Sequence, residues 1–527
     1  MSISNQHKKQ SLKSQSMKRT VFYIVLFSIF IFACTKTEEK HPSEDPLRPF
    51  YNQDMSPFYF GVASGDPLKD RVIIWTKVEP NGSNNEVEWE VSSDENFTSI
   101  VNSGIAKIAS GDNYTIKVDA DNLEPSTYYY YRFKYNERYS PTGRTKTAST
   151  DSDSLKFAVV SCSNYEFGYF NAYRGIANRN DIDAVLHLGD YIYEYASGIY
   201  RNSSSDRKHI PQHELISLED YRIRYGQYRL DSDLQAAHQY QPFITIWDDH
   251  EIANNAYKDG AQNHQEEEGA YETRKAAARK AYYEWLPVRE SPTLYRKFDY
   301  GKLAEVVMLD ERLEGRTEPV DTVDNPFIAD SSRTMLGSKQ LQWFENQLVN
   351  SNSTWKLIGN QVIYSYLNWG FPSWKINMDS WDGYPIERTH IKQTILENEI
   401  ENVVFVTGDT HSSWAFEVTD DPFINYDSAT SEGAFALEFG TTSINSGNSD
   451  ENMSADTVRR HEKKITNTAL NPHLKFANLR DHGYLLITLT EESVRAQWYY
   501  VESVLDQNSS EYLGKEVSVP AGSVDIR

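Results

Sequence analysis

Apolar runs of strand length alternate with helical stretches between residues 155 and 505. The apolar runs lie at 157–161, 184–188, 243–247, 304–309, 355–359, 403–407, 434–439 and 484–489. The helical stretches lie at 272–285, 338–350 and 388–400. Because this alternation is typical of layered α/β architecture, we predict one large α/β domain over residues 151–505. Long polar insertions at 198–240 and 252–270 interrupt it, and loops of that length often shape a binding cleft.

The chain before residue 150 has short β-like runs and no helical stretch. The runs are 72–75, 87–91, 114–118 and 128–133. Turn residues such as Pro80-Asn81-Gly82 separate them, so we predict a small all-β domain over residues 55–150. Its stretch Leu123–Phe133 resembles the late strands of a fibronectin type III-like sandwich. At the other end, residues 506–527 are predicted to be an irregular C-terminal tail.

The first residues have the pattern of an export signal. Basic residues precede the apolar run 21–33, which is too short to span a bilayer comfortably. The run ends in Ile31-Phe32-Ala33-Cys34, which resembles a bacterial lipobox. We therefore expect a signal peptide over 1–33, lipidation of Cys34 and a lipid-anchored polar linker over 34–54. The expected location is an exported, membrane-tethered lipoprotein in the periplasm or at the cell surface, and a plain membrane anchor or a secreted protein are the alternatives.

The charge balance narrows the range of partners. The formal net charge is −23, and removal of residues 1–33 would take away five basic residues and no acidic one. Such a surface repels nucleic acid, so a nucleic-acid-binding module is excluded. Phosphate-ester substrates would also be repelled unless bound cations supplied local positive charge. Neither the natural substrate nor the oligomeric state can be deduced from the sequence.

Chemically reactive side chains follow several of the apolar runs. They are Cys162, Asp190 with Tyr193, Asp249 with His250, and Asp409 with His411. Ligands of open α/β sheets bind beyond the carboxyl ends of the strands, so these residues are predicted to meet at one edge. Thiolate, phenolate and imidazole together suit a transition metal, and the carboxylates suit calcium, magnesium or manganese. Each residue alone also has a structural explanation, namely an inert buried cysteine, a helix cap or a strand-end turn.

Taken in order, the motifs resemble those of the PhoD-like alkaline phosphatases, within the calcineurin-like metallophosphoesterase and purple acid phosphatase superfamily. The stretch 60–67 looks like the opening of the family's N-terminal domain. The catalytic motifs and C-terminal landmarks appear at 161–174, 187–194, 247–251, 407–411, 471–476 and 481–484. The resemblance covers nearly all of the mature chain. It implies a metallophosphoesterase β-sandwich flanked by helices, preceded by the small all-β sandwich.

The resemblance also implies the cofactors Fe³⁺ and Ca²⁺. The residues that match the iron ligands are Cys162, Asp190, Tyr193 and His411. Asp190 would also bridge to calcium, which Asp249 and Asp409 match, and His250 matches the catalytic histidine. Further candidate ligands are Asn254, Asn255, Asn360 and Gln361, and Arg174 is a candidate phosphate contact. Against the wider superfamily, Cys162 and Asp409 replace the usual aspartate and histidine, and Asp249 replaces an asparagine, which agrees with calcium at the second site.

These matches lead to one main hypothesis and two alternatives. The main one is an exported metal-dependent phosphatase that hydrolyses phosphomonoesters, phosphodiesters or both through a metal-bound hydroxide, without a covalent phosphoenzyme. The first alternative is a phospholipase D-like phosphodiesterase of the same family. The second, from a different class, is a surface binding lipoprotein whose sandwich domain recognises a partner.

Overall fold

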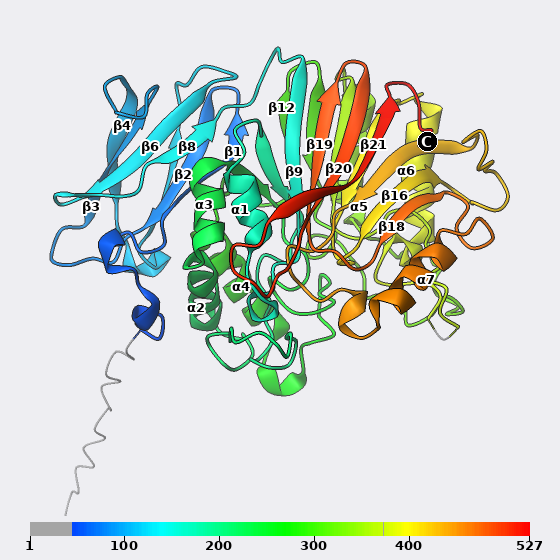
Figure 1. The fold of residues 1–527 in the computed structure, drawn as a ribbon, viewed down its shortest axis with the longest axis horizontal. Helices are drawn as coiled ribbons and strands as arrows, with labels where there is room; N and C mark the ends of the chain where they lie inside the picture. The colour runs from blue at the N-terminus through cyan, green and yellow to red at the C-terminus, as the bar shows by residue number, and fades with distance from the viewer. Residues whose placement is uncertain (1–44, 373, 527) are drawn as a thin grey trace, which may run out of the picture. The chain divides into compact units, whose positions relative to one another are not determined.

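Two large sheets contain the apolar runs predicted for the α/β region (Figure 1). The structure is a computed structural model that describes residues 45–372 and 374–526. The nine-stranded sheet has the order β21 (Glu511–Pro520), β20 (Ser493–Val501), β19 (Gly483–Thr490), β9 (Ser154–Val160), β10 (Ala184–His187), β11 (Pro242–Thr245), β1 (Val62–Leu68), β2 (Arg71–Lys77) and β5 (Thr115–Ala120). The seven-stranded sheet has the order β12 (Arg296–Tyr300), β13 (Ala304–Met308), β14 (Trp355–Asn360), β15 (Val403–Thr407), β17 (Ala434–Gly440), β16 (Ser413–Thr419) and β18 (Leu474–Asn478).

The central strands are parallel and buried on both faces. In β9, the residues Phe157, Ala158, Val159 and Val160 are all fully buried. Such continuous apolar runs are typical of parallel strands that are covered on both sides. One apolar core lies between the two sheets and contains side chains of β9, β10, β13 and β15. Both large sheets therefore share their main hydrophobic core.

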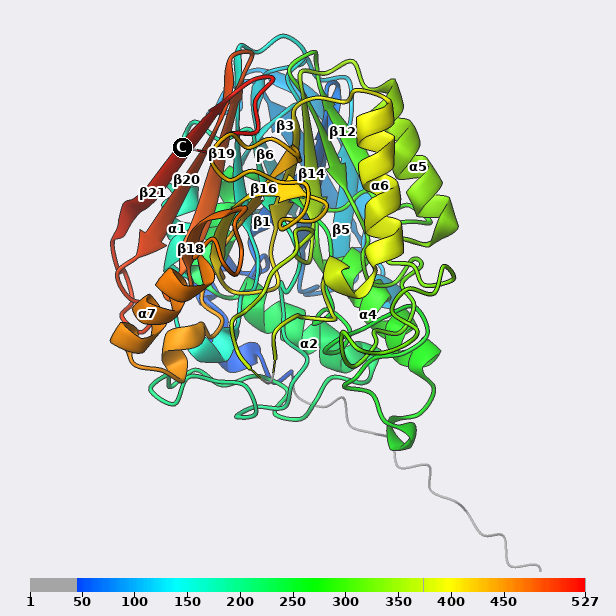
Figure 2. The same cartoon turned by 90° about the vertical axis from the view of Figure 1, so that its right-hand side faces the viewer.

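Helices cover the outer faces of the sheets. Figure 2 shows α5 (Gly337–Asn350) and α6 (Pro385–Glu397) side by side against the seven-stranded sheet, where Phe344 and Leu348 of α5 are buried four residues apart. The other helices are α1 (Asn171–Ala177), α2 (Leu218–Arg229), α3 (Ser232–Tyr240), α4 (Tyr271–Trp285) and α7 (Ala455–Ile465). Of these, α1 and α3 pack against each other and against the nine-stranded sheet.

The N-terminal region forms the predicted sandwich but shares one of its sheets with the large domain. Its outer sheet consists of β4 (Ile100–Lys107), β3 (Glu86–Ser92), β6 (Tyr128–Tyr135) and β7 (Arg138–Tyr139), with β8 (Gly143–Lys146) also paired to β6. Strand β1 pairs in parallel with β11, so the nine-stranded sheet continues across residue 150. In β2, Val72 and Ile74 pack into the N-terminal core, whereas Trp75 packs into the main core.

Three segments differ from the sequence-based expectation. The tail is not irregular, because β21 forms an edge strand paired with β20. The polar insertion 198–240 contains α2 and α3. Within the predicted linker, Leu47 is buried in the main core. The predicted signal peptide and Cys34, the predicted lipidation site, lie outside the described residues. Among the residues that are described, no helix combines the length and the apolar character needed to cross a bilayer.

Candidate metal centre and active site

The candidate metal ligands follow strands of both large sheets at one edge. Cys162 follows β9, Asp190 follows β10 and Asp249 follows β11, and these three strands are parallel neighbours. Asp409 and His411 follow β15 of the other sheet. A bridge between Ser161 and Ser443 joins the two sheets beside Cys162. The predicted convergence of these strand ends is therefore present.

The backbone turns sharply at four of the candidate ligands. The φ angles are +62° at Cys162, +55° at Asp190, +58° at Asp409 and +55° at His411. Residues other than glycine rarely adopt this left-handed region, and such strain is concentrated at functional sites. At Gly189, which has a φ of +104°, an added Cβ would lie 2.3 Å from the backbone nitrogen of Asp248. Only glycine allows the β10 and β11 turns to approach so closely.

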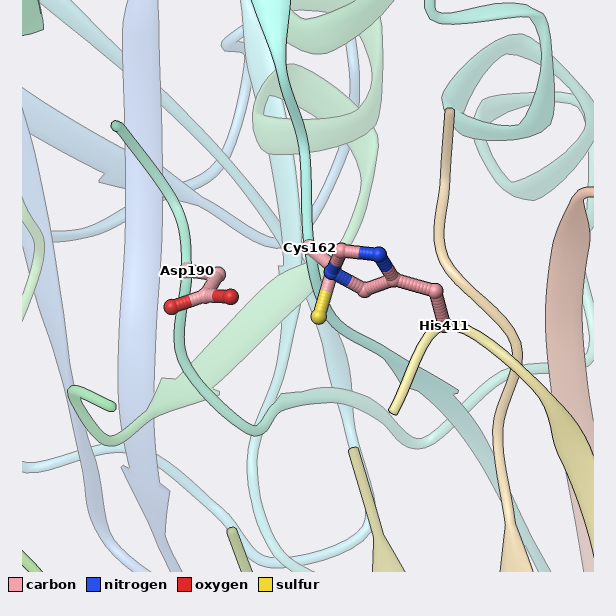
Figure 3. Close-up of side chains that lie close together, drawn as sticks. All are labelled: Cys162, Asp190 and His411. Carbon is pink, nitrogen blue, oxygen red and sulfur yellow. The ribbon is translucent and has the colours of Figure 1, made fainter. Parts of the chain in front are cut away.

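The first cluster consists of Cys162, Asp190 and His411, whose ligand atoms all lie within 4.8 Å of one another (Figure 3). Tyr193 joins it, since its hydroxyl donates to Asp190 Oδ2 at 3.0 Å and lies 3.1 Å from His411 Nε2. With His411 Nδ1 donating to the carbonyl of Gly447 at 2.8 Å, Nε2 keeps its lone pair for a metal. Sulfur, phenol, imidazole and carboxylate therefore meet at one point.

Two further clusters continue from the first. One contains Asp190, Asp249 and His250, and the other contains Asp248, Asp249 and Asp409. In each cluster the ligand atoms lie within 4.8 Å of one another. The buried Oδ1 of Asp190 has no hydrogen-bond partner among the described residues. An orphaned carboxylate oxygen between the two ligand sets fits a residue that bridges two cations.

The titration behaviour of the clusters reflects concentrated negative charge. Burial raises the pKa of the Cys162 thiol well above its usual range, and the nearby Asp190 adds to this effect. Burial also raises the pKa of Asp190, and the carboxylates of Asp249 and Asp248 raise it further against the opposing effect of His250. Burial raises the pKa of Asp409 to about 7, although Arg312 opposes the shift. Cations bound here would neutralise this negative charge and favour the deprotonated forms of these groups.

Arg312 provides part of the positive charge that compensates these buried carboxylates. Its guanidinium is fully buried and pairs with Asp248, with Asp379 at 2.7 Å and with Asp409 at 3.1 Å. Its distance to Asp249 is 3.8 Å. Burial raises the pKa of Asp249, but Arg312 and His250 outweigh burial and lower it to about 2. Arg312 therefore holds the carboxylates of the all-oxygen cluster in place.

A cavity of about 420 Å³ opens onto these clusters. Its lining residues are Asp190, Tyr195, Ile199, Tyr200, Asp249, His250, Asn254, Asn255, Asp409 and His411. Ile199 is 72% exposed at this cavity, so one wall is apolar. The cavity therefore places a small substrate against the candidate ligands and His250 together.

Comparison with known proteins identifies the family. The PhoD-like phosphatase profile matches residues 157–498, and the profile of the family's N-terminal domain matches residues 45–149. The chain belongs to the PhoD-like phosphatase family. It is 37% identical to alkaline phosphatase D of Bacillus subtilis (strain 168) over 482 residues, which are 86% of this chain and 79% of that protein. The predicted family and the enzyme class, a phosphoric ester hydrolase, are thereby confirmed.

Solved structures confirm the predicted fold class. A structure of PhoD matches with a TM-score of 0.80 and 36% identity, covering 90% of this chain and 92% of that chain. A purple acid phosphatase from yellow lupin seeds matches with a TM-score of 0.53 and covers 87% of this chain and 73% of that chain. Since its identity is only 11%, this second likeness concerns the fold alone.

Several candidates from the sequence lie away from the PhoD-like site or have other partners. The guanidinium of Arg174, the candidate phosphate contact, binds Asp233, Asn508, Asn171 and the carbonyl of Ser509, and Arg174 is not among the residues that line the cavity. Its contact with phosphate stays a prediction. Asn360 Oδ1 accepts from Trp381, and Gln361 Oε1 accepts from the backbone of Glu311. These two amides stabilise the fold, whereas Asn254 and Asn255 line the cavity.

Sequence reasoning missed Arg312 and Glu194. Arg312 comes four residues after the end of β13, in a polar Asp310-Glu311-Arg312 triplet that follows an apolar run. That position was a usable signal, because the other site residues also follow apolar runs. Glu194 is the last residue of the family-like motif 187–194, but nothing in the sequence indicates that it binds His250. The roles of the individual metal ligands stay predictions.

Proposed function

We propose that this PhoD-like phosphatase is an exported, metal-dependent enzyme that hydrolyses phosphomonoesters, phosphodiesters or both at alkaline pH. Cys162, Asp190, Tyr193 and His411 would hold ferric iron. Asp190, Asp249 and Asp409 would hold calcium. The observation that supports this proposal is the set of three clusters linked through Asp190 and Asp249. Within each cluster the ligand atoms lie within 4.8 Å of one another, and together the clusters draw on four strand ends.

The donor atoms fit two unlike cations. The first cluster combines sulfur, phenol and imidazole, which favour a transition metal, and the third contains only carboxylates, which favour calcium. When bound, such cations polarise a phosphoryl group and activate water for attack, so that no covalent phosphoenzyme is needed. They would also attract a phosphate ester to a protein with a net charge of −23.

His250 is positioned to act as the proton donor. Its Nδ1 is engaged by the Glu194 carboxylate at 2.7 Å, which leaves Nε2 for the substrate. Burial lowers the pKa of His250, but the carboxylates of Asp249 and Glu194 outweigh burial and raise it well above its usual range. His250 therefore holds a proton that it can give to the leaving oxygen at the cavity wall.

The export and the lipid anchor belong to this proposal as well. They are supported by the basic and apolar pattern of residues 1–33 and by the lipobox-like Ile31–Cys34. We expect a Cys34→Ala protein to leave the membrane fraction when the full chain is expressed in a bacterium. Retention of that variant in the membrane, with no lipid on residue 34 of the wild type, would exclude the lipid anchor.

Purified mature protein tests the enzymatic part. We expect turnover of 4-nitrophenyl phosphate, of bis(4-nitrophenyl) phosphate or of both, loss of that turnover in chelator and recovery with calcium. Elemental analysis should find iron and calcium together. Undiminished turnover in excess chelator, with no metal in the protein, would overturn the proposal.

A further inference from the structure

A second cavity, of about 440 Å³, adjoins the active-site cavity. The two cavities share Asn255 as a lining residue. The other lining residues are Tyr257, Ala261, Gln262, Glu318, Pro319, Val320, Asp321, Trp374, Asn377, Met378 and Asp379. Asp379 also connects the cavities through Arg312, which pairs with Asp409 of the metal centre. A phosphate ester at the metal centre could therefore extend its alcohol group into this space.

The charge of the second cavity comes mainly from two carboxylates. Asp379 is neutralised, because one oxygen pairs with Arg312 and the other with Arg316. Glu318 and Asp321 are exposed, and among the described residues neither forms an ion pair with a basic side chain. These two carboxylates leave the cavity negatively charged, so a second phosphate group would be repelled from it.

The walls of the cavity combine aromatic and apolar side chains with polar ones. Trp374 is 45% exposed and its ring lies 5.0 Å from that of Trp369. Tyr257 and Met378 provide further polarizable surface, and Pro319 and Val320 complete the apolar part. Tyr257 and Glu318 line the same cavity. Aromatic faces beside carboxylates are the surroundings in which proteins bind ammonium groups.

We propose that this second cavity is a subsite for the alcohol part of the phosphate ester, and that it selects an alcohol bearing an ammonium group. The inference rests on the proposed function, because the phosphate must lie at the metal centre for its alcohol to reach this subsite. Glu318 and Asp321 attract the positive charge of the ammonium group. Trp374 and Tyr257 contact the groups bound to its nitrogen. The side-chain amides of Gln262 and Asn377 also line the cavity and can form hydrogen bonds with hydroxyl groups of the alcohol.

The test compares two monophosphates that differ in charge but hardly in shape. Phosphocholine carries a trimethylammonium group, and 3,3-dimethylbutyl phosphate carries a neutral tert-butyl group in its place. Each is used to inhibit whichever 4-nitrophenyl ester the metal-loaded enzyme hydrolyses. We expect the inhibition constant of phosphocholine to be about 3- to 10-fold lower than that of the neutral compound.

Variants without the negative charges test whether the preference for phosphocholine comes from this subsite. The double substitution Glu318→Gln with Asp321→Asn should bring the two inhibition constants together, and Trp374→Ala should weaken phosphocholine more than the neutral compound. Asp324→Asn is the matched control, since Asp324 is an exposed acid of the same loop outside the cavity lining. Glu318, Asp321 and Asp324 are exposed acids, so their substitution should not disturb folding. For Trp374→Ala, a far-ultraviolet circular dichroism spectrum that matches the wild type verifies that the protein is folded.

The outcomes separate this inference from the proposed function. If no 4-nitrophenyl ester is hydrolysed, the proposed function fails and the subsite fails with it. If esters are hydrolysed but both compounds inhibit equally in the wild type, or the preference survives the double substitution, only the subsite is overturned. Hydrolysis of glycerophosphocholine and of phosphatidylcholine vesicles then shows whether the ammonium alcohol comes from a soluble ester or from a lipid headgroup.

Discussion

Nδ1 of His250 lies 2.7 Å from Oε2 of the fully buried Glu194. The other oxygen of Glu194 accepts from the backbone of Asn254 at 2.7 Å and from the side chain of Asn263 at 2.8 Å. These bonds fix the carboxylate, and the carboxylate in turn fixes the orientation of the imidazole and the position of its proton. His250, the proposed proton donor, is therefore oriented by a residue that does not line the cavity.

A Glu194→Gln substitution tests this orientation. The glutamine oxygen can still accept from Nδ1, but the negative charge that helps to raise the pKa of His250 is lost. His250 then releases its proton at a lower pH, so the alkaline limb of the pH–rate profile should move to lower pH. At the optimum we expect kcat to fall by about 10- to 100-fold. The measurement is a full pH–rate profile of the metal-loaded enzyme.

Glu267→Gln is the control for this change, because Glu267 is an exposed acid and does not line the cavity. Its pH–rate profile should match that of the wild type. A Glu194→Gln profile with an unmoved alkaline limb would contradict the role of Glu194, even if kcat had fallen.

Arg312 gives a second prediction, which concerns stability. In an Arg312→Gln protein the carboxylates of Asp248 and Asp409 lose their buried positive partner, whereas Asp379 keeps Arg316. Breaking a buried ion pair by removing one partner costs about 3–5 kcal/mol of unfolding free energy. We expect that loss in chelator and a partial recovery in calcium, because a cation can replace some of the missing charge. Thermal and urea unfolding with and without calcium measure both effects.

The control for Arg312 is Arg459→Gln, since Arg459 is 54% exposed on α7 and its ion-pair partner among the described residues is an exposed acid. Its stability should change by less than about 1 kcal/mol. Equal stability of Arg312→Gln and the wild type in chelator would show that Arg312 does not balance the buried carboxylates.

The sequence predicted the central strands well because their burial is two-sided. Continuous apolar runs form the strands β9, β10, β13 and β15. Such a run predicts a buried strand from the local sequence alone. The edge strand β21 lacks this pattern, since most of its residues are exposed. It is ordered by pairing with β20 and by packing of Val517 and Val519 into the main core. Edge strands of this kind depend on contacts that a local pattern does not contain.

Helix α2 was missed for a different physical reason. Its buried face consists of tyrosines and arginines, including Tyr221, Arg224 and Tyr225, so it looks polar in the sequence. The buried Arg224 is satisfied by the carbonyls of Tyr195 and Pro211, which are distant in sequence. Similarly, the strand-end motifs indicated Asp190, Asp249 and Asp409, but not the arginine that pairs with Asp409 from another strand end.

Tyr193 allows a spectroscopic prediction about the first metal. A phenolate bound to ferric iron absorbs visible light by charge transfer, so the iron-loaded protein should be coloured. In a Tyr193→Phe protein we expect the band to disappear or to move, while iron is retained by Cys162, Asp190 and His411. Tyr195→Phe is the matched control, because Tyr195 lines the cavity but its hydroxyl is not bonded to Asp190 or His411. An unchanged spectrum in Tyr193→Phe would exclude phenolate ligation.

His473, which is not part of the candidate metal clusters, makes the stability of the protein dependent on pH. It is almost completely buried, and its Nε2 lies 2.9 Å from the carbonyl of Tyr366. Burial lowers its pKa to about 4, although the hydrogen bond to Tyr366 opposes the shift. In the unfolded chain the pKa is about 6.5. Between these values the unfolded chain binds a proton that the folded protein does not bind.

The free energy of unfolding should therefore decrease as the pH falls from about 6.5 to about 4. The slope from His473 alone is about 1.4 kcal/mol per pH unit, or about 3 kcal/mol over the whole window. Above pH 6.5 both states are neutral at this residue, so its contribution is complete and constant. Urea unfolding of the metal-free protein at pH 7 and pH 5 measures the effect without interference from metal release.

A His473→Gln substitution removes the titrating group and can keep the hydrogen bond to Tyr366. Its unfolding free energy should fall by about 2 kcal/mol less than that of the wild type between pH 7 and pH 5. His390→Gln is the control, because His390 is 57% exposed and its substitution should leave the slope unchanged. If His473→Gln and the wild type lose the same free energy over this interval, the folded protein does not hold His473 in its neutral form.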